Sequence, residues 1–242
     1  MNEPILKINK VSKHFGGNIA VSDVTFAVEE NRIFGLIGPN GAGKTTLFNC
    51  MTGFVPITSG EVMFNNRKIN NLRPDAVCRI GMVRTWQRVK PLSSLSVLDN
   101  VMVGAFAITG SAGAARKIAV EKLAQVGLSD YSAKLAGSLS IGLKKKLELA
   151  RVLATRPKML LLDEICGGLN HTETASILQL IRDVREEGTT ILFIEHDMKA
   201  VTSICERIVV LNSGVKLAEG TPAEITSNPE VIAAYLGGGF DA

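Results

Sequence analysis

The segment 38–45, which reads GPNGAGKT, constrains the fold of this chain more than any other feature. It matches the phosphate-loop pattern G-x-x-x-x-G-K-[ST], and a short apolar run, 33–37, precedes it. Glycines let the backbone wrap closely enough for several N–H groups to point inward, and a following helix adds the positive end of its dipole. The pattern therefore predicts a buried strand, a loop that binds phosphate, and a helix over about 44–51.

Three side chains in and just after this loop have the chemistry to contact a nucleoside triphosphate. Lys44 can reach the β- and γ-phosphates, and the Thr45 hydroxyl can ligate Mg²⁺. Thr46 is placed to hold the phosphates nearer the sugar. A merely glycine-rich connection would not explain Lys44 and Thr45. The predicted nucleotide-binding residues of the loop are Gly38, Pro39, Asn40, Gly41, Ala42, Gly43, Lys44, Thr45 and Thr46.

A second apolar run, 159–162, ends in two adjacent acids, Asp163 and Glu164. A carboxylate at the edge of a core is costly unless it is paired, so we expect these two acids to bind a cation or to act in catalysis. Asp163 can hold the Mg²⁺ that bridges the phosphates, and Glu164 can polarise the attacking water as general base. This pattern is common by itself, but together with the phosphate loop it predicts a hydrolase.

A third strand, predicted over 190–194, ends in Glu195, His196 and Asp197. An isolated histidine is more often structural than catalytic. Ligands of doubly wound sheets, however, bind at the carboxyl ends of parallel strands, where this histidine would lie. An imidazole can hydrogen-bond the γ-phosphate in either protonation state, so we interpret His196 as a site residue because the other two motifs are present.

Hydrophobic periodicity predicts one domain with a helical insertion. Residues 1–87 and 155–242 have the strand and helix patterns of an α/β core that begins with short antiparallel strands, and 88–154 have helical periodicity. Segments 208–211 and 215–218 predict a hairpin, and 222–236 predict a helical tail with a break near Asn228.

Composition excludes several other classes of protein. A chain of 242 residues with 46% apolar residues can bury a full core. Its apolar runs fall far below the roughly 18 residues that cross a bilayer, and its start lacks a charged-then-apolar leader. We therefore expect a cytosolic chain that acts at a membrane only through a partner.

The four cysteines show no metal-type spacing and are expected to be reduced thiols. The basic run 67–90 could face nucleotide, anionic lipid or nucleic acid, and the run 144–146 could steer ATP, but both are expected to be solvated faces.

Together these motifs resemble the ATPases of ABC (ATP-binding cassette) transporters over residues 6–236. The family signature, usually LSGGQ, corresponds to LSIGL at 139–143, upstream of the strand 159–162. Ser140 suits a helix N-cap, and its hydroxyl with the Gly142 N–H forms an anion site. In the family this site binds the γ-phosphate of ATP held by the other protomer. The resemblance thus implies ATP and Mg²⁺ as cofactors and a RecA-like P-loop NTPase core with an N-terminal antiparallel β subdomain and an inserted α-helical subdomain.

The resemblance also implies roles that spacing does not reveal. Gln87 matches the Q-loop, which links Mg²⁺ and the attacking water to the membrane partner. Phe15 matches the aromatic that stacks on adenine, although a core phenylalanine is an alternative interpretation. His196 matches the H-switch. The implied catalytic residues are Glu164, His196, Gln87 and Lys44, and the implied Mg²⁺ ligands are Thr45, Gln87 and Asp163.

Four positions depart from the family pattern. Ile141 replaces the first signature glycine, Leu143 replaces the signature glutamine, Ile165 replaces the proline after the Walker B glutamate, and Asn170 replaces a common aspartate. Because Ser140 and Gly142 are retained, we expect an altered but working signature.

Softer features, such as RTWQ at 84–87 and AEGTP at 218–222, are similar to importers of branched-chain amino acids. Other cargoes of that group (urea, amides) or of the nearby lipopolysaccharide exporters stay open. The implied partners are two membrane permease subunits, a second ATPase subunit and, indirectly, a substrate-binding protein. The implied location is the cytoplasmic face of the plasma membrane, and no nucleic acid is expected as a partner. The second ATPase subunit could be an identical copy or a paralogue.

Two alternatives come from other classes. A soluble ABC ATPase acting on DNA or the ribosome would carry long coiled coils or two cassettes, and neither pattern is present. A GTPase would carry an Asn-Lys-x-Asp guanine reader, which is absent, and a small-molecule kinase would leave Ser140 and His196 unexplained.

Overall fold

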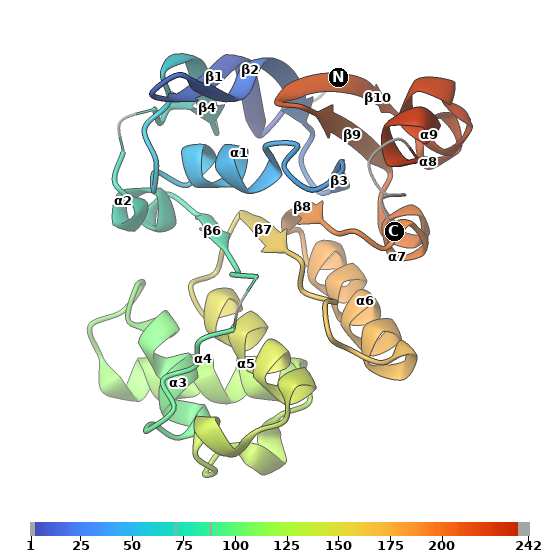
Figure 1. Cartoon of the computed structure of the whole chain (residues 1–242). Helices are drawn as coiled ribbons and strands as arrows, with labels where there is room; N and C mark the ends of the chain where they lie inside the picture. The colour runs from blue at the N-terminus through green and yellow to red at the C-terminus, as the bar shows by residue number, and fades with distance from the viewer. Residues whose placement is uncertain (1–2, 71, 88, 237–242) are drawn as a thin grey trace.

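The computed structural model describes residues 3–70, 72–87 and 89–236, and two β-sheets form its upper half in Figure 1. The first sheet is antiparallel, and its strands alternate buried and exposed side chains because one face packs on the core. Asn65 and Asn66 both have positive φ, as a two-residue hairpin turn requires. The strand order is β2 (Asn18–Val28), β1 (Leu6–Phe15), β4 (Ser59–Phe64), β5 (Arg67–Lys68).

The second sheet contains the strands predicted to be buried. Strands β9, β3, β8, β7 and β6 run parallel, and the edge strand β10 is antiparallel to β9. Every residue of β3, β7 and β8 is buried, because helices and the first sheet cover both faces. The order is β10 (Val215–Gly220), β9 (Arg207–Asn212), β3 (Ile33–Ile37), β8 (Thr190–Ile194), β7 (Met159–Asp163), β6 (Met82–Arg84).

The apolar runs of this sheet divide between two hydrophobic clusters. Leu161 and Leu192 face the first sheet and α1 (Lys44–Met51), which lies between the two sheets in Figure 1. Leu160 and Ile191, one residue earlier on each strand, pack on the opposite side with α6 (His171–Glu186). The remaining helices around the sheets are α2 (Pro74–Arg79), α7 (Met198–Ile204), α8 (Pro222–Ser227) and α9 (Pro229–Leu236).

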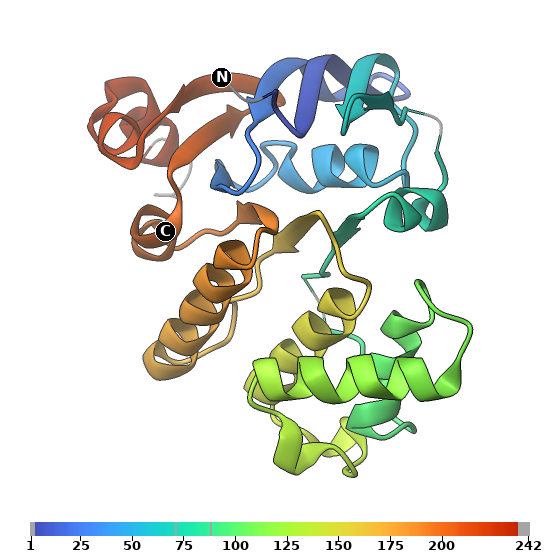
Figure 2. The same cartoon turned by 180° about the vertical axis from the view of Figure 1, so that it is seen from behind.

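Three helices pack against one another below the sheets: α3 (Val97–Ala105), α4 (Ala112–Gln125) and α5 (Ile141–Leu153). In Figure 2 the green α4 lies in front of the other two. Helix α5 begins at Ile141, directly after Ser140, the residue that the sequence predicted as an N-cap. The division into core (1–87, 155–242) and helical subdomain (88–154) stays a prediction, and residues 1–2, 71, 88 and 237–242 lie outside the described residues.

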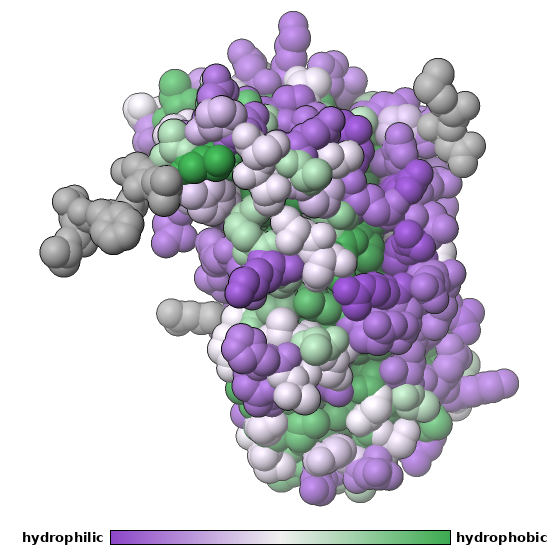
Figure 3. Space-filling view, turned by 90° about the vertical axis from the view of Figure 1, so that its right-hand side faces the viewer, coloured by the Kyte–Doolittle hydropathy of each residue, from purple (hydrophilic) through white to green (hydrophobic). Residues whose placement is uncertain are grey.

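The surface is mixed in character. In Figure 3 hydrophilic residues cover most of the upper part of the face shown, and apolar residues are more frequent in the lower part. Within the described ranges, no helix combines the length and the apolar character needed to cross a membrane.

Candidate nucleotide site

The phosphate loop connects β3 to α1 and needs glycine at specific positions. Gly38 and Gly43 have φ values of 151° and 97°. A Cβ at Gly38 would lie 2.1 Å from the Leu211 carbonyl oxygen, and one at Gly43 would lie 2.4 Å from the Ala20 carbonyl oxygen. Only glycine permits this approach of one backbone to another, so the loop is held tightly between β2 and β9.

Lys44 is buried at the start of α1, with 5% of its surface exposed. Its Nζ donates to the carbonyl oxygens of Gly38 (2.7 Å) and Pro39 (3.0 Å). Burial lowers the pKa of the ammonium, and the nearby carboxylates of Glu164 and Asp163 oppose this shift. The loop thus holds a desolvated cation that an incoming phosphate can bind.

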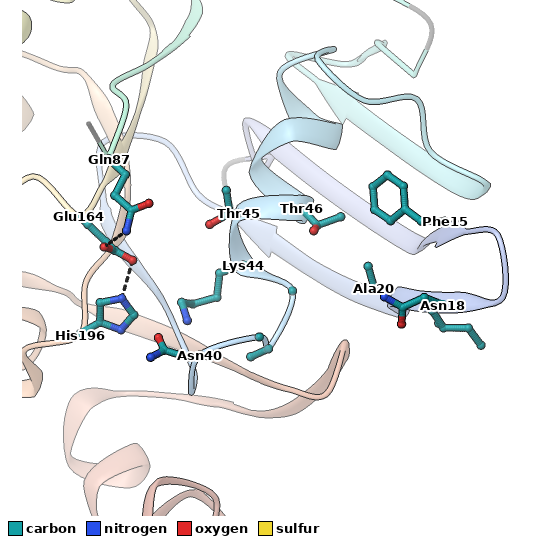
Figure 4. A pocket seen from close by; sticks show the side chains of 14 residues that line it. Phe15, Asn18, Ala20, Asn40, Lys44, Thr45, Thr46, Gln87, Glu164 and His196 are labelled. Atoms are coloured by element: carbon teal, nitrogen blue, oxygen red, sulfur yellow. Dashed lines mark hydrogen bonds and ion pairs between the residues drawn. The ribbon is translucent and has the colours of Figure 1, made fainter. Parts of the chain in front are cut away.

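A cavity of about 450 Å³ opens in front of this loop. Figure 4 shows Glu164, Gln87 and His196 at one end and Phe15 at the other, with the phosphate loop between them. Phe15 is 49% exposed, so the alternative of a core phenylalanine is wrong. The cavity is lined by Phe15, Asn18, Ile19, Ala20, Asn40, Gly41, Ala42, Gly43, Lys44, Thr45, Thr46, Gln87, Glu164 and His196.

Three neighbouring strand ends bring one amide, one carboxylate and one imidazole together. The Gln87 amide donates from Nε2 to Glu164 Oε2 at 2.6 Å, and His196 Nε2 contacts the other oxygen of Glu164. These residues follow β6, β7 and β8, which are adjacent in the sheet. Glu164 has a φ of 50°, an uncommon conformation for a residue other than glycine. The carboxylate is thereby turned into the cavity, facing the phosphate loop (Figure 4).

Asp163 lies behind this group and is almost fully buried. Its Oδ2 accepts from the Arg84 guanidinium at 2.6 Å, and its Oδ1 is buried with no hydrogen-bond partner among the described residues. Burial raises the pKa of this carboxyl, and Arg84 opposes the rise. Thr45, Gln87, Arg84 and Asp163 line a second cavity beside the first.

Arg84 was not among the predicted site residues. It was counted in the basic run 67–90 and expected on a solvated face, which is wrong for this residue because it is 7% exposed. Besides Asp163 it bonds Asn49 Oδ1 at 2.5 Å, and its guanidinium lies 4.3 Å from the Trp86 ring centre. A basic residue at the end of a buried strand was the available signal. Arg88, in the same run, lies outside the described residues.

The signature segment does not join either cavity. Ser140 caps α5 as predicted, accepting from the Leu143 N–H at 3.4 Å, and Ile141 is half exposed. A Cβ at Gly142 would lie 2.4 Å from Oε1 of Glu173, so a larger residue here would displace this carboxylate at the start of α6. The structure therefore brings together the phosphate loop, Gln87, Glu164 and His196, and leaves Ser140 and Gly142 apart from them.

A phosphate loop facing an acid, an amide and a histidine at one edge of a parallel sheet defines a P-loop nucleoside triphosphatase. Residues 21–167 match the family model described as ABC transporter. Residues 215–241 match the model described as branched-chain amino acid ATP-binding cassette transporter. The chain belongs to the ABC transporter family, and the predicted fold class and ATP hydrolase activity are confirmed.

Known proteins with similar sequences or structures align with nearly the whole chain. The high-affinity branched-chain amino acid transport ATP-binding protein BraF of Pseudomonas aeruginosa is 42% identical, covering 98% of this chain and 99% of its own. LivG of Salmonella typhimurium, with the same description, is 41% identical at the same coverage. Among solved structures, the ADP conformation of MJ1267, an ATP-binding cassette of an ABC transporter, has a TM-score of 0.89 at 31% identity. The match covers 98% of this chain and 100% of the MJ1267 chain. A nucleotide-free cassette from an ABC transporter also has a TM-score of 0.89, at 30% identity, and the match covers 96% of this chain and 99% of that cassette.

Proposed function

We propose that this chain is the ATP-hydrolysing subunit of an importer of branched-chain amino acids. The observation that carries the proposal is the cavity in which the phosphate loop faces Glu164, Gln87 and His196. The family models over 21–167 and 215–241 support the importer and its cargo. In this proposal two ATPase subunits bind beneath two membrane permeases at the cytoplasmic face of the membrane, and a substrate-binding protein delivers the cargo.

The proposed hydrolysis uses the side chains that line the cavity. Phe15 stacks on adenine, and the backbone N–H groups of 38–45 with Lys44 hold the phosphates. Glu164 accepts a proton from the attacking water, and Gln87, which already contacts it, orients that water. His196 donates a hydrogen bond to the γ-phosphate and holds Glu164 in place.

Thr45, Gln87 and Asp163 would hold Mg²⁺. They line the same cavity, and Oδ1 of Asp163, which bonds none of the residues that the structure describes, is an oxygen ligand of the kind that Mg²⁺ prefers. When bound, Mg²⁺ neutralises charge that develops on the β- and γ-phosphates. Arg84 bonds the other oxygen of Asp163, Oδ2, and so leaves Oδ1 to ligate the metal ion.

An apolar surface beside Gln87 is suited to a permease helix. Phe54 and Trp86 are 47% and 43% exposed and pack edge to face, with ring centres 4.8 Å apart. Val103 of α3, 47% exposed, lines the same cavity of about 210 Å³. A permease helix bound here would touch the residue that precedes Gln87, which links transport to hydrolysis.

We expect the purified chain to recover integral membrane permeases from detergent-solubilised membranes. Val103→Asp should lower this recovery at least about fivefold, because a charge buried in an interface costs more than 1 kcal/mol. Val120→Asp is the matched control, since Val120 is 52% exposed on α4 and lies outside that cavity. Recovery of ribosomes or nucleic acid in place of permeases would contradict the proposal.

A head-to-tail dimer is a second expected result. With ATP, Glu164→Gln protein should dimerise in light scattering, and a further Ser140→Ala change should abolish the dimer. Ser111→Ala is the matched control, because Ser111 caps α4 through the same 3.4 Å contact as Ser140. If ATP binds and no dimer forms even with Ser140 intact, either the altered signature does not close over nucleotide or the partner is a paralogous subunit, and a heterodimer is then the next test.

A further inference from the structure

Helix α5 carries two charged side chains that are buried one turn apart. Lys145 and Glu148 are 3% and 2% exposed, and their spacing places them on the same face of the helix. Lys145 belongs to the lysine run 144–146, which was expected to be solvated, so that expectation is wrong for this residue. Buried charges are costly unless their polar atoms are bonded, so the hydrogen bonds of these two side chains show which segments they hold in place.

Glu148 holds the loop that carries Gln87. Its Oε1 accepts from the backbone N–H of Trp86 at 3.0 Å, one residue before Gln87. Burial raises the pKa of the Glu148 carboxyl, and this backbone N–H opposes the rise. The hydrogen bond thus fixes the backbone from which Gln87 projects into the cavity.

Lys145 holds the loop that carries Glu164. Its Nζ donates to the backbone carbonyl oxygen of Glu164 at 3.1 Å. In the part of the chain that the structure describes, no carboxylate lies within ion-pair distance of this ammonium. Burial lowers the pKa of this ammonium, and nearby buried acids, Glu195 foremost, oppose the shift through space. The direct hydrogen bond goes to the backbone of Glu164, so Lys145 positions that backbone as well as balancing charge.

The two contacts therefore connect one face of α5 to the two loops that carry Gln87 and Glu164. Gln87 and Glu164 are the side chains that bond each other at 2.6 Å in the cavity. The same helix begins with Ser140 and Gly142, the signature residues, which lie apart from the cavity. A shift of α5 would move the backbone of both loops.

We propose that Lys145 and Glu148 are positioning residues that keep Glu164 and Gln87 aligned with the signature helix, so that movement of α5 on dimer closure reaches the catalytic carboxylate. The inference rests on the proposed roles of Glu164, Gln87 and the signature. It adds that α5 contributes to the site through its buried middle as well as through its first turn.

The test removes each contact and then restores it. Lys145→Met and Glu148→Leu should lower kcat about tenfold or more while KM for ATP changes less than about threefold, because a loop displaced by an ångström misplaces the base and leaves the phosphate loop intact. Lys145→Arg and Glu148→Gln keep the donor and the acceptor and should recover most of the activity. Lys144→Met and Lys146→Met are matched controls on the same helix, and both lysines are partly exposed.

A second readout does not depend on activity. Trp86 is the only tryptophan of the chain, so intrinsic fluorescence reports the Gln87 loop directly. Glu148→Leu should change the emission of Trp86, and Lys144→Met should leave it unchanged. Lys145→Met removes the cost of burying an ammonium, and it also removes a cation that favours the charged form of the buried Glu195 carboxylate. Thermal melting measures whether the variant keeps the fold, and Lys145→Arg provides the same test with the charge retained.

Three outcomes would overturn the inference: unchanged kcat in folded Lys145→Met protein, an equal loss in Lys144→Met, or failure of the conservative variants to recover activity. Failure of the proposed function would look different. In that case Glu164→Gln would hydrolyse ATP normally, whatever the variants on α5 do.

Discussion

Glu164→Gln protein is expected to bind ATP with nearly the affinity of the unmodified chain and to hydrolyse it at least about 100-fold more slowly. Glutamine has the same shape, and its amide oxygen can still accept from Gln87 Nε2, as the carboxylate does at 2.6 Å. It cannot take a proton from water. The change therefore removes the base and leaves the phosphate loop and Lys44 as they are.

Phosphate release in steady state measures the turnover, and titration with a fluorescent ATP analogue measures the affinity. Glu186→Gln is the matched control, because Glu186 is exposed at the end of α6, away from the cavity. Normal turnover by Glu164→Gln would remove the assignment of the base. Loss of both turnover and ATP affinity would show that Glu164 supports the phosphate loop instead.

Local patterns predicted the parts of this fold and site that depend on neighbours in the sequence. The glycines at 38–45 predicted the loop because only glycine allows its backbone conformation. Ser140 was predicted as an N-cap because a cap needs nothing beyond the next three residues. The apolar run 159–162 predicted β7 with its acids at the end.

Residues whose roles depend on distant segments could not be predicted in this way. Arg84 bonds Asp163, 79 positions later, and Glu148 bonds Trp86, 62 positions earlier. In sequence each belongs to a charged stretch that is typical of a solvated face. Their burial depends on the packing of β6 against β7 and of α5 beneath them, which no local periodicity specifies. The parallel strand order brought the end residues together, and the sequence pattern had predicted that edge only in general terms.

Lys44→Ala is expected to weaken ATP binding about 10- to 100-fold, since a hydrogen bond to a charged group contributes roughly 1.5–3 kcal/mol. The ammonium is already desolvated at 5% exposure and is held by two backbone carbonyl oxygens, so it meets the phosphates with little further cost of ordering. ADP should lose less affinity than ATP, because Lys44 reaches both the β- and γ-phosphates and ADP offers only one of them.

Equilibrium titration with fluorescent ATP and ADP analogues measures both losses. Lys68→Ala is the matched control, because Lys68 is exposed and pairs with Glu61 on the antiparallel sheet, outside the cavity. Among the described residues, Lys44 Nζ donates to two carbonyl oxygens of its own loop. The variant should therefore melt close to the unmodified chain, and a loss of affinity can then be attributed to the missing ammonium. Unchanged ATP affinity in a folded variant would mean that 38–45 is not the triphosphate site, and the roles proposed for Glu164 and His196 would fall with it, because both are defined by a γ-phosphate held at this loop.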